Sequence, residues 1–156
     1  MKKQLTLIGM LVAMTIAGCS KDANEEPDTE YPAIDISANT FPQQCSEIKR
    51  GETFTYRVRF SDNRELGSSS VDIHHNFDHH SHSTVIEPCN LEPKKTAVKP
   101  FLLIRTYDIP AGLKTYDLNQ QIQVPADVDP GDYHFSIRVT DKEGWQSIKG
   151  LSIKII

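Results

Sequence analysis

Five of the six histidines in this chain lie between residues 74 and 82, in the segment VDIHHNFDHHSH that spans residues 71–82. Neutral imidazole is the commonest side-chain ligand for zinc, copper and nickel. A loop selected only for solubility would use Lys, Glu, Ser or Asn rather than so many histidines. The segment therefore predicts a site for a divalent transition metal, with the ligands drawn from His74, His80, His82 and, as a further candidate, His79.

Strand periodicity separates the members of this segment, because successive side chains of a strand point to opposite faces. Asp72 and His74 would share one face. Ile73 and His75 would face the core, and Phe77 would fix the start of the following loop. We expect His75 to be a buried histidine packed against apolar neighbours.

Carboxylates next to the histidines fit the same chemistry. Asp72 and Asp78 could complete the site as a fourth ligand or orient an imidazole ring through a hydrogen bond. The sixth histidine, His134, stands alone on the polar face of a later predicted strand, where we expect it to be exposed to solvent. It would matter for the site only if that strand lay beside the cluster.

The histidine-rich segment is also compatible with roles that need no metal. It could be a polar loop, a pH-responsive surface whose imidazoles charge together near pH 6, or a recognition site for another ligand. We find no HExxH helix, no G-x-S-x-G elbow and no nucleophile–base pair. We therefore do not expect an enzyme.

The N-terminus predicts a lipoprotein. Two lysines precede an apolar stretch at residues 5–16, which is shorter than the ~20 residues of a membrane-spanning helix. The stretch ends in Ile-Ala-Gly-Cys at residues 16–19, which resembles the bacterial lipobox. We expect a signal peptide at residues 1–18, cleavage before Cys19 and covalent lipid on Cys19. The alternative is an ordinary cleavable signal that happens to contain a cysteine.

Residues 19–30 are polar and acidic, and we expect them to form a disordered tether. Ser20 after the cysteine resembles an outer-membrane sorting signal, and the acidic residues resemble a surface-export signal. We expect a lipid-anchored protein on the cell surface, with the periplasmic face as the alternative. The formal net charge of −4 offers no basic surface for nucleic acid.

The remaining cysteines and the methionines narrow the choice of metal. Cys45 and Cys89 would lie in an oxidising compartment, where we expect a disulfide; two thiolate ligands are the alternative. All three methionines fall within the expected signal peptide, so the mature chain lacks the soft ligands of a Cu(I) site. Zinc is the leading candidate, and Cu(II) and Ni(II) remain open.

Short alternating runs separated by turn residues are typical of an all-β sandwich. We predict about seven strands, at residues 33–37, 53–60, 69–75, 101–107, 114–125, 132–140 and 151–155. This pattern favours one immunoglobulin-like antiparallel β-sandwich, cadherin-like or fibronectin-like, over residues 31–156. Tyr133 and the four residues before it resemble the tyrosine corner of that fold. Asp141 and Glu143 alone would be weak calcium ligands, so we expect a plain turn there.

The histidine run at residues 71–78, followed by His80 and His82, resembles a motif of Gram-negative surface lipoproteins grouped as a domain of unknown function. The closing segment at residues 131–145 is similar to the last strands of that group. The resemblance extends over the expected mature domain. It implies a lipobox followed by an immunoglobulin-like sandwich, and it implies no activity.

Two functions follow as hypotheses. The first is a surface lipoprotein that binds a divalent transition metal through the histidines and captures or buffers it for an outer-membrane transporter. The second is an interaction module that binds protein or glycan without a metal. An exposed aromatic residue on a loop would favour the second, and Trp145 in a predicted hairpin is the first candidate.

Overall fold

The structure is a computed structural model that describes residues 26–37, 39–84 and 89–156. These residues form strands and connections without a helix, so none of them could cross a membrane as a helix. The expected signal peptide and Cys19 lie outside the described residues. The strands are β1 (Ala33–Asp35), β2 (Glu47–Ile48), β3 (Thr53–Ser61), β4 (Leu66–His75), β5 (Leu103–Asp108), β6 (Thr115–Gln123), β7 (Gly131–Asp141) and β8 (Gln146–Ile155).

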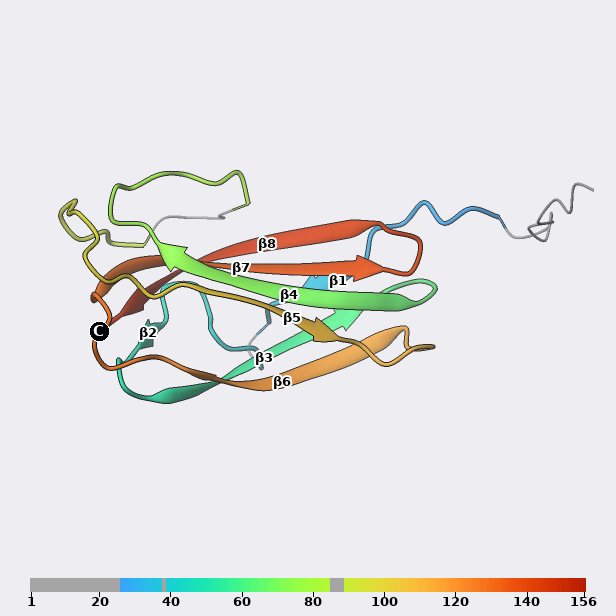
Figure 1. Cartoon of the computed structure of the whole chain (residues 1–156). Coiled ribbons are helices and arrows are strands. Elements are labelled where there is room, and N and C mark those ends of the chain that lie inside the picture. Colours follow the sequence, from blue (N-terminus) through green and yellow to red (C-terminus); the bar gives the residue numbers. More distant parts are fainter. Residues whose placement is uncertain (1–25, 38, 85–88) are drawn as a thin grey trace, which may run out of the picture.

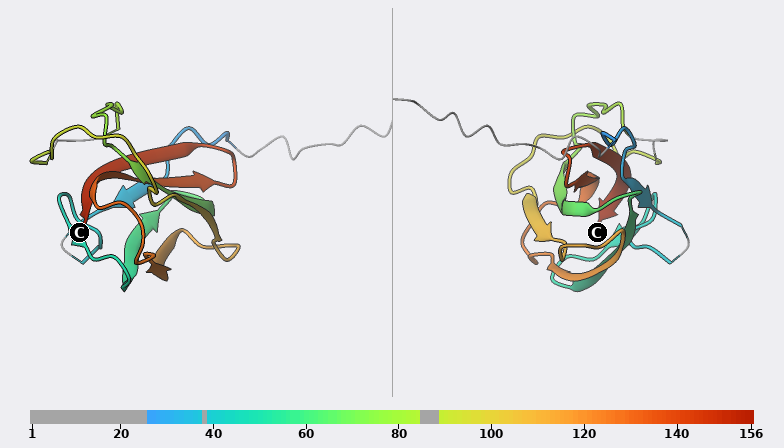
Figure 2. Two further views of the ribbon diagram at one scale, coloured as in Figure 1. Left: turned by 60° about the vertical axis from the view of Figure 1, so that its left-hand side comes forward. Right: turned by 90° about the vertical axis from the view of Figure 1, so that its right-hand side faces the viewer.

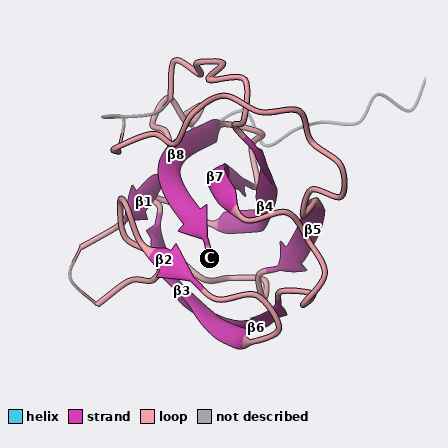
Figure 3. Ribbon diagram, turned by 90° about the vertical axis from the view of Figure 1, so that its left-hand side faces the viewer, coloured by secondary structure: helices cyan, strands magenta, loops and turns pink. Residues whose placement is uncertain are grey.

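The strands form two sheets that face each other, as the view along the strands in Figure 3 shows. One sheet has the order β1-β3-β6, and the other has the order β2-β8-β7-β4-β5. All pairs are antiparallel except β2 with β8. The predicted all-β sandwich is confirmed, and the arrangement is consistent with an immunoglobulin-like fold (Figure 1).

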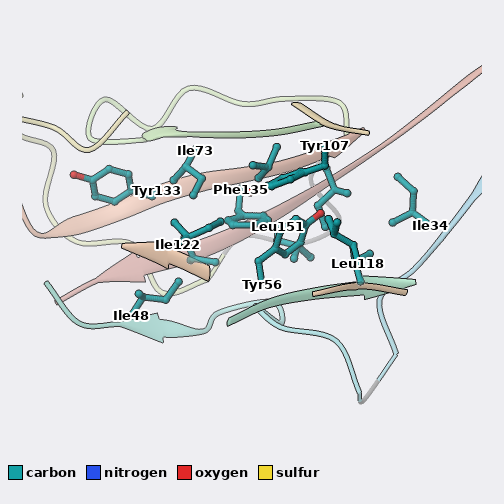
Figure 4. Close-up of a cluster of buried hydrophobic side chains, with 14 of the residues drawn as sticks. Ile34, Ile48, Tyr56, Ile73, Tyr107, Leu118, Ile122, Tyr133, Phe135 and Leu151 are labelled. Carbon is teal, nitrogen blue, oxygen red and sulfur yellow. The ribbon is translucent and has the colours of Figure 1, made fainter. Parts of the chain in front are cut away.

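The core lies between the sheets and is filled by alternate residues of the long strands, as the sequence pattern predicts. Figure 4 shows Tyr56 of β3, Ile73 of β4 and Phe135 of β7 pointing into the same apolar space. The residues between them, such as Asp72 and His134, must then point away from the core. This parity decides which side chains can build a site on the outer face of the larger sheet.

The tyrosine corner is present at the start of β7. The Tyr133 hydroxyl donates a hydrogen bond of 2.6 Å to the backbone carbonyl of Asp129. The same hydroxyl accepts a bond of 3.1 Å from the backbone N–H of Phe101. These bonds join the start of β7 to the connection that leads into β5, and they support the immunoglobulin-like assignment.

Several details differ from the sequence-based expectation. The last strand, β8, begins at Gln146 rather than residue 151. β2 was not predicted, because a two-residue strand has no periodicity to detect. β4 begins at Leu66 rather than residue 69, and it contains a bulge between Leu66 and Ser68. Of the expected tether, residues 26–30 are described, and Asp28 among them is buried against the domain.

A long connection, residues 76–102, joins β4 to β5. Its start, drawn in green, lies on the side of the sandwich away from β3 and β6 in both views of Figure 2. The predicted disulfide between Cys45 and Cys89 is present, with 5.6 Å between the Cα atoms, and it anchors the return of this connection. Connections of this length in compact domains are usually either functional or linker segments.

Candidate functional site

The site starts from two histidines on neighbouring strands. His74 of β4 and His134 of β7 are direct partners in the antiparallel register. Both stand at positions that alternate with core residues, so both project from the outer face of the larger sheet. Their rings lie 5.4 Å apart between centroids.

A tight turn after β4 brings the rest of the segment back over this face. The backbone N–H of His79 donates 3.2 Å to the carbonyl of Asn76, which closes the turn. Phe77 is buried, and its ring packs edge-on against Tyr133 at 5.3 Å, as expected for a residue that fixes the start of the loop. The chain therefore reverses just before His80 and His82.

The loop continues across β8 at a glycine. The backbone N–H of Gly150 donates 3.1 Å to the carbonyl of Thr84. A Cβ atom at this position would stand 2.9 Å from the Thr84 hydroxyl oxygen, closer than side chains normally approach. Gly150 thus allows the loop to lie directly on the sheet, and the loop covers the outer face at this end of β7.

Four imidazoles meet where the loop crosses the sheet, and we call His74, His80, His82 and His134 the histidine cluster. Each offers one ring nitrogen, and these nitrogen atoms all lie within 4.8 Å of one another. The Nε2 atoms of His74 and His82 are 3.1 Å apart. The rings of His82 and His134 lie 4.7 Å apart between centroids.

Two carboxylates orient two of the rings. His74 donates from Nδ1 to Asp72 at 2.8 Å, and His80 donates from Nδ1 to Asp78 at 2.6 Å. The bond from His80 lowers the pKa of Asp78 to about 2. In a neutral ring that donates through Nδ1, Nε2 carries the lone pair and is free to bind a cation. Of the two predicted roles, the geometry favours orientation over direct ligation.

The sequence analysis placed His134 wrongly. We expected it to be exposed, but it is only 3% exposed because the loop covers its strand face. Its Nε2 donates 3.3 Å to the His80 carbonyl, which leaves Nδ1 buried without a hydrogen-bond partner. Burial lowers the pKa of His134 to about 4, and the nearby His82, His80 and His74 act in the same direction.

The other two histidines of the segment lie outside the cluster. His79 has a positive φ of 59°, and its Nε2 donates 2.9 Å to the carbonyl of Glu92. Its inclusion among the candidate ligands is therefore not supported by the geometry. His75 is half-buried rather than fully buried, and its ring packs against Phe77 at 4.9 Å.

The cluster is open to solvent on the side of His82, which is exposed. Burial lowers the pKa of His82, and the neighbouring His74 and His80 add to this effect. Two pockets of about 220 and 340 Å³ border the cluster, and His82 lines both of them. An ion could therefore reach the rings without opening the fold.

These residues fit a tetrahedral metal centre. Zinc bound to imidazoles at 2.0–2.1 Å places neighbouring nitrogen atoms about 3.3 Å apart. The separation of 3.1 Å between His74 Nε2 and His82 Nε2 is close to that distance. The Nδ1 of His134 lacks a hydrogen-bond partner and, in a ring that donates through Nε2, carries a lone pair. The described cysteines are joined in a disulfide and offer no thiolate to the site.

Fold and site together define a β-sandwich domain with a histidine cluster on one sheet face. The chain belongs to the family Domain of unknown function (DUF4625), which matches residues 18–156. No curated protein matches the chain. A solved structure, that of a DUF4466 family protein from Parabacteroides merdae, is similar with a TM-score of 0.51 and 14% identity. The match covers 82% of this chain and 46% of the other, and at this identity it shows a similarity of fold alone.

Trp145 does not stand free on its hairpin. Its indole N–H donates 2.9 Å to the carbonyl of Asp28, and its ring meets Tyr31 edge-on at 4.8 Å. It holds the N-terminal segment against the domain, so it is a poor candidate for the aromatic contact that a protein-binding or glycan-binding module would use.

Proposed function

We propose that this protein is a lipid-anchored outer-membrane lipoprotein, displayed on the cell surface, that binds a divalent transition metal through the histidine cluster. Zinc is the leading candidate, with Cu(II) and Ni(II) as alternatives, because four imidazoles without thiolate or thioether suit these ions. The observation that carries the proposal is the convergence of four ring nitrogens within 4.8 Å from three separate segments of the chain.

Separate observations support the lipid anchor and the role of the metal site. The Ile-Ala-Gly-Cys sequence at residues 16–19 supports a lipidated Cys19, and the short acidic segment after it would keep the domain near the membrane. A metal held by four protein ligands has no open position for catalysis, which favours capture or buffering. His82 is exposed and could be released, so the ion could be passed to a partner such as an outer-membrane transporter.

The test is a zinc titration by calorimetry on the mature chain, residues 19–156, with Cys19→Ser to omit lipid and free thiol. The protein carries no tag and is first stripped of metal with a chelator. We expect one zinc ion per chain with a Kd well below about 100 μM. Competition with Cu(II) and Ni(II) ranks the three ions, and Co(II) absorption in the visible range reports whether the ligands are tetrahedral.

Two variants make the test specific. His82→Ala removes an exposed ligand with little risk to the fold and should weaken zinc binding strongly. His79→Asn changes a histidine of the same loop that lies outside the cluster, and Asn suits its positive φ. Equal loss in both variants, or no zinc binding by the parent chain, would contradict the proposal.

Anchoring is tested separately in a Gram-negative host. Cys19→Ala should move the protein from the membrane to the soluble fraction, and protease added to intact cells should cleave the parent protein. Protection from protease until the outer membrane is opened would place it on the periplasmic face instead.

A further inference from the structure

Three carboxylates meet at the opposite end of strand β7. Asp28, Asp141 and Glu143 each offer one oxygen, and these oxygens lie within 4.8 Å of one another. We call these three residues the acidic site. Asp28 precedes β1, Asp141 ends β7, and Glu143 lies in the turn to β8, so the fold assembles the group from two distant parts of the chain. In Figure 1 the N-terminal segment, drawn in blue, runs beside this end of β7 and β8.

Each buried carboxylate uses one oxygen for structure and leaves the other without a hydrogen-bond partner. Asp141 Oδ1 accepts hydrogen bonds from the backbone N–H groups of Gly144 and Trp145, at 2.6 and 2.7 Å. Asp141 is only 4% exposed, yet its Oδ2 is buried without a hydrogen-bond partner. Such an oxygen loses its hydration on folding and gains nothing in return unless a ligand reaches it.

Asp28 repeats this arrangement. Its Oδ1 accepts bonds from the Asn63 side chain at 2.9 Å and from the backbone N–H of Glu30 at 3.0 Å. These bonds lower the pKa of Asp28, so it is ionised at neutral pH. Its side chain is fully buried, and Oδ2 lacks a hydrogen-bond partner, with the Arg64 Nε at 4.0 Å. One distant guanidinium does not balance three carboxylates.

We propose that Asp28, Asp141 and Glu143 form a calcium site that fastens the N-terminal segment to the β7–β8 turn. Calcium binds carboxylate oxygens at 2.3–2.6 Å, so two of its ligands stand at most about 5 Å apart, as the oxygens of the acidic site do. Exposed Glu143 leaves room for the water molecules that complete seven or eight ligands. Magnesium is a poorer fit because it demands a regular octahedron and retains its waters.

Calcium bound here would join the segment that leads from the lipid anchor to the body of the domain. Trp145 already bonds the carbonyl of Asp28 through its indole, and it is the one tryptophan of the chain. Its fluorescence is therefore a direct reporter of this site. The inference is independent of the histidine cluster, which lies about 23 Å away along β7 at about 3.3 Å per residue.

The test uses the same mature chain with Cys19→Ser, freed of metal and titrated with CaCl2 while Trp145 fluorescence and the Tm are recorded. We expect saturable changes in both, with a Kd between about 0.1 and 1 mM, the range of extracellular calcium modules. Magnesium at the same concentrations should produce less than a tenth of the effect.

Glu143→Gln is the decisive variant, because Glu143 is exposed and its replacement should leave the fold intact. It should weaken calcium binding at least about tenfold. Asp141→Asn keeps the oxygen that caps the turn and should do the same, whereas Lys142→Gln, in the same turn, should bind calcium as the parent does. The inference is overturned if calcium changes neither signal up to about 10 mM, or if Glu143→Gln responds like the parent chain.

Discussion

The two ends of strand β7 carry two groups of ionisable side chains that differ in chemistry and in origin. At one end His134 meets three imidazoles, two of them held by carboxylates. At the other end Asp141 meets Asp28 and Glu143, and two buried oxygens lack a hydrogen-bond partner. Nitrogen ligands suit zinc and its neighbours, whereas carboxylate oxygens suit calcium. On our two proposals, the same strand carries one site for zinc or a similar transition metal and one for calcium.

The two groups also differ in how the chain builds them. Three of the four clustered histidines come from residues 74–82, and one strand pairing adds the fourth. The acidic site needs Asp28, which is far from Asp141 in sequence and is brought to it through Trp145 and Asn63. The comparison teaches that a site concentrated in one segment can be seen in a sequence, whereas a site divided between segments cannot.

The largest expected effect is that variants at each site weaken the binding of one ion and leave the binding of the other unchanged. His80→Ala/His82→Ala should lower zinc affinity by at least about a thousandfold, because two of four ligands are lost, and should leave the calcium response unchanged. Glu143→Gln should weaken calcium binding and leave zinc affinity unchanged. Calorimetry with each ion on each variant gives the four affinities. If either variant weakened the binding of both zinc and calcium, the two sites would be coupled, which would contradict the view that they are independent.

The disulfide should matter to one end only. Cys45→Ala/Cys89→Ala should lower the free energy of unfolding by about 4 kcal/mol in the chain-entropy argument, since a loop of 44 residues is no longer closed. Zinc affinity should also fall, because Cys89 anchors the connection that carries the cluster. Denaturant unfolding and zinc titration measure both effects. A matching loss of calcium affinity would show that the variant disturbs the whole domain.

Acid should destabilise the histidine end in metal-free protein. The pKa of His134 is about 4 in the folded chain and near 6.5 when unfolded, so below pH 6.5 the unfolded state takes up the proton first. This contribution is therefore fully present above pH 6.5 and is lost as the pH falls towards 4, by about 3 kcal/mol. Urea unfolding between pH 4 and 8 measures it. His134→Gln should flatten the curve, and an unchanged slope would contradict this account of His134.

The smallest effect concerns the carboxylates that orient the rings. Asp78→Asn should weaken zinc binding by about tenfold, because His80 would lose a charged partner while all four imidazoles remain. Asp117→Asn, on an exposed strand position far from the cluster, is the matched control. A loss as large as that of the double histidine variant would make Asp78 a direct ligand, and our assignment of its role would be wrong.

Much of the fold could be predicted because alternation is a local property. Tyr56, Val58 and Phe60 lie on one face of β3 as the sequence indicates, and Tyr133 forms the expected corner. The parity of β4 likewise put Asp72 and His74 on one face. The position of β2 could not be predicted, because its two residues pair with β8 from the other end of the chain.

The sequence by itself determined the pattern of strands, the pair of cysteines and the concentration of imidazoles near the end of β4. Only the tertiary structure decided which of them meet. His134 belongs to the cluster because the strand register places it opposite His74 and the loop covers it. His79 does not belong to it, because its ring donates a hydrogen bond to the carbonyl of Glu92 instead. Asp28 met Asp141 for the same reason. Contacts between distant residues depend on which strands pair and on the path of the loops, and a local pattern of residues does not specify either.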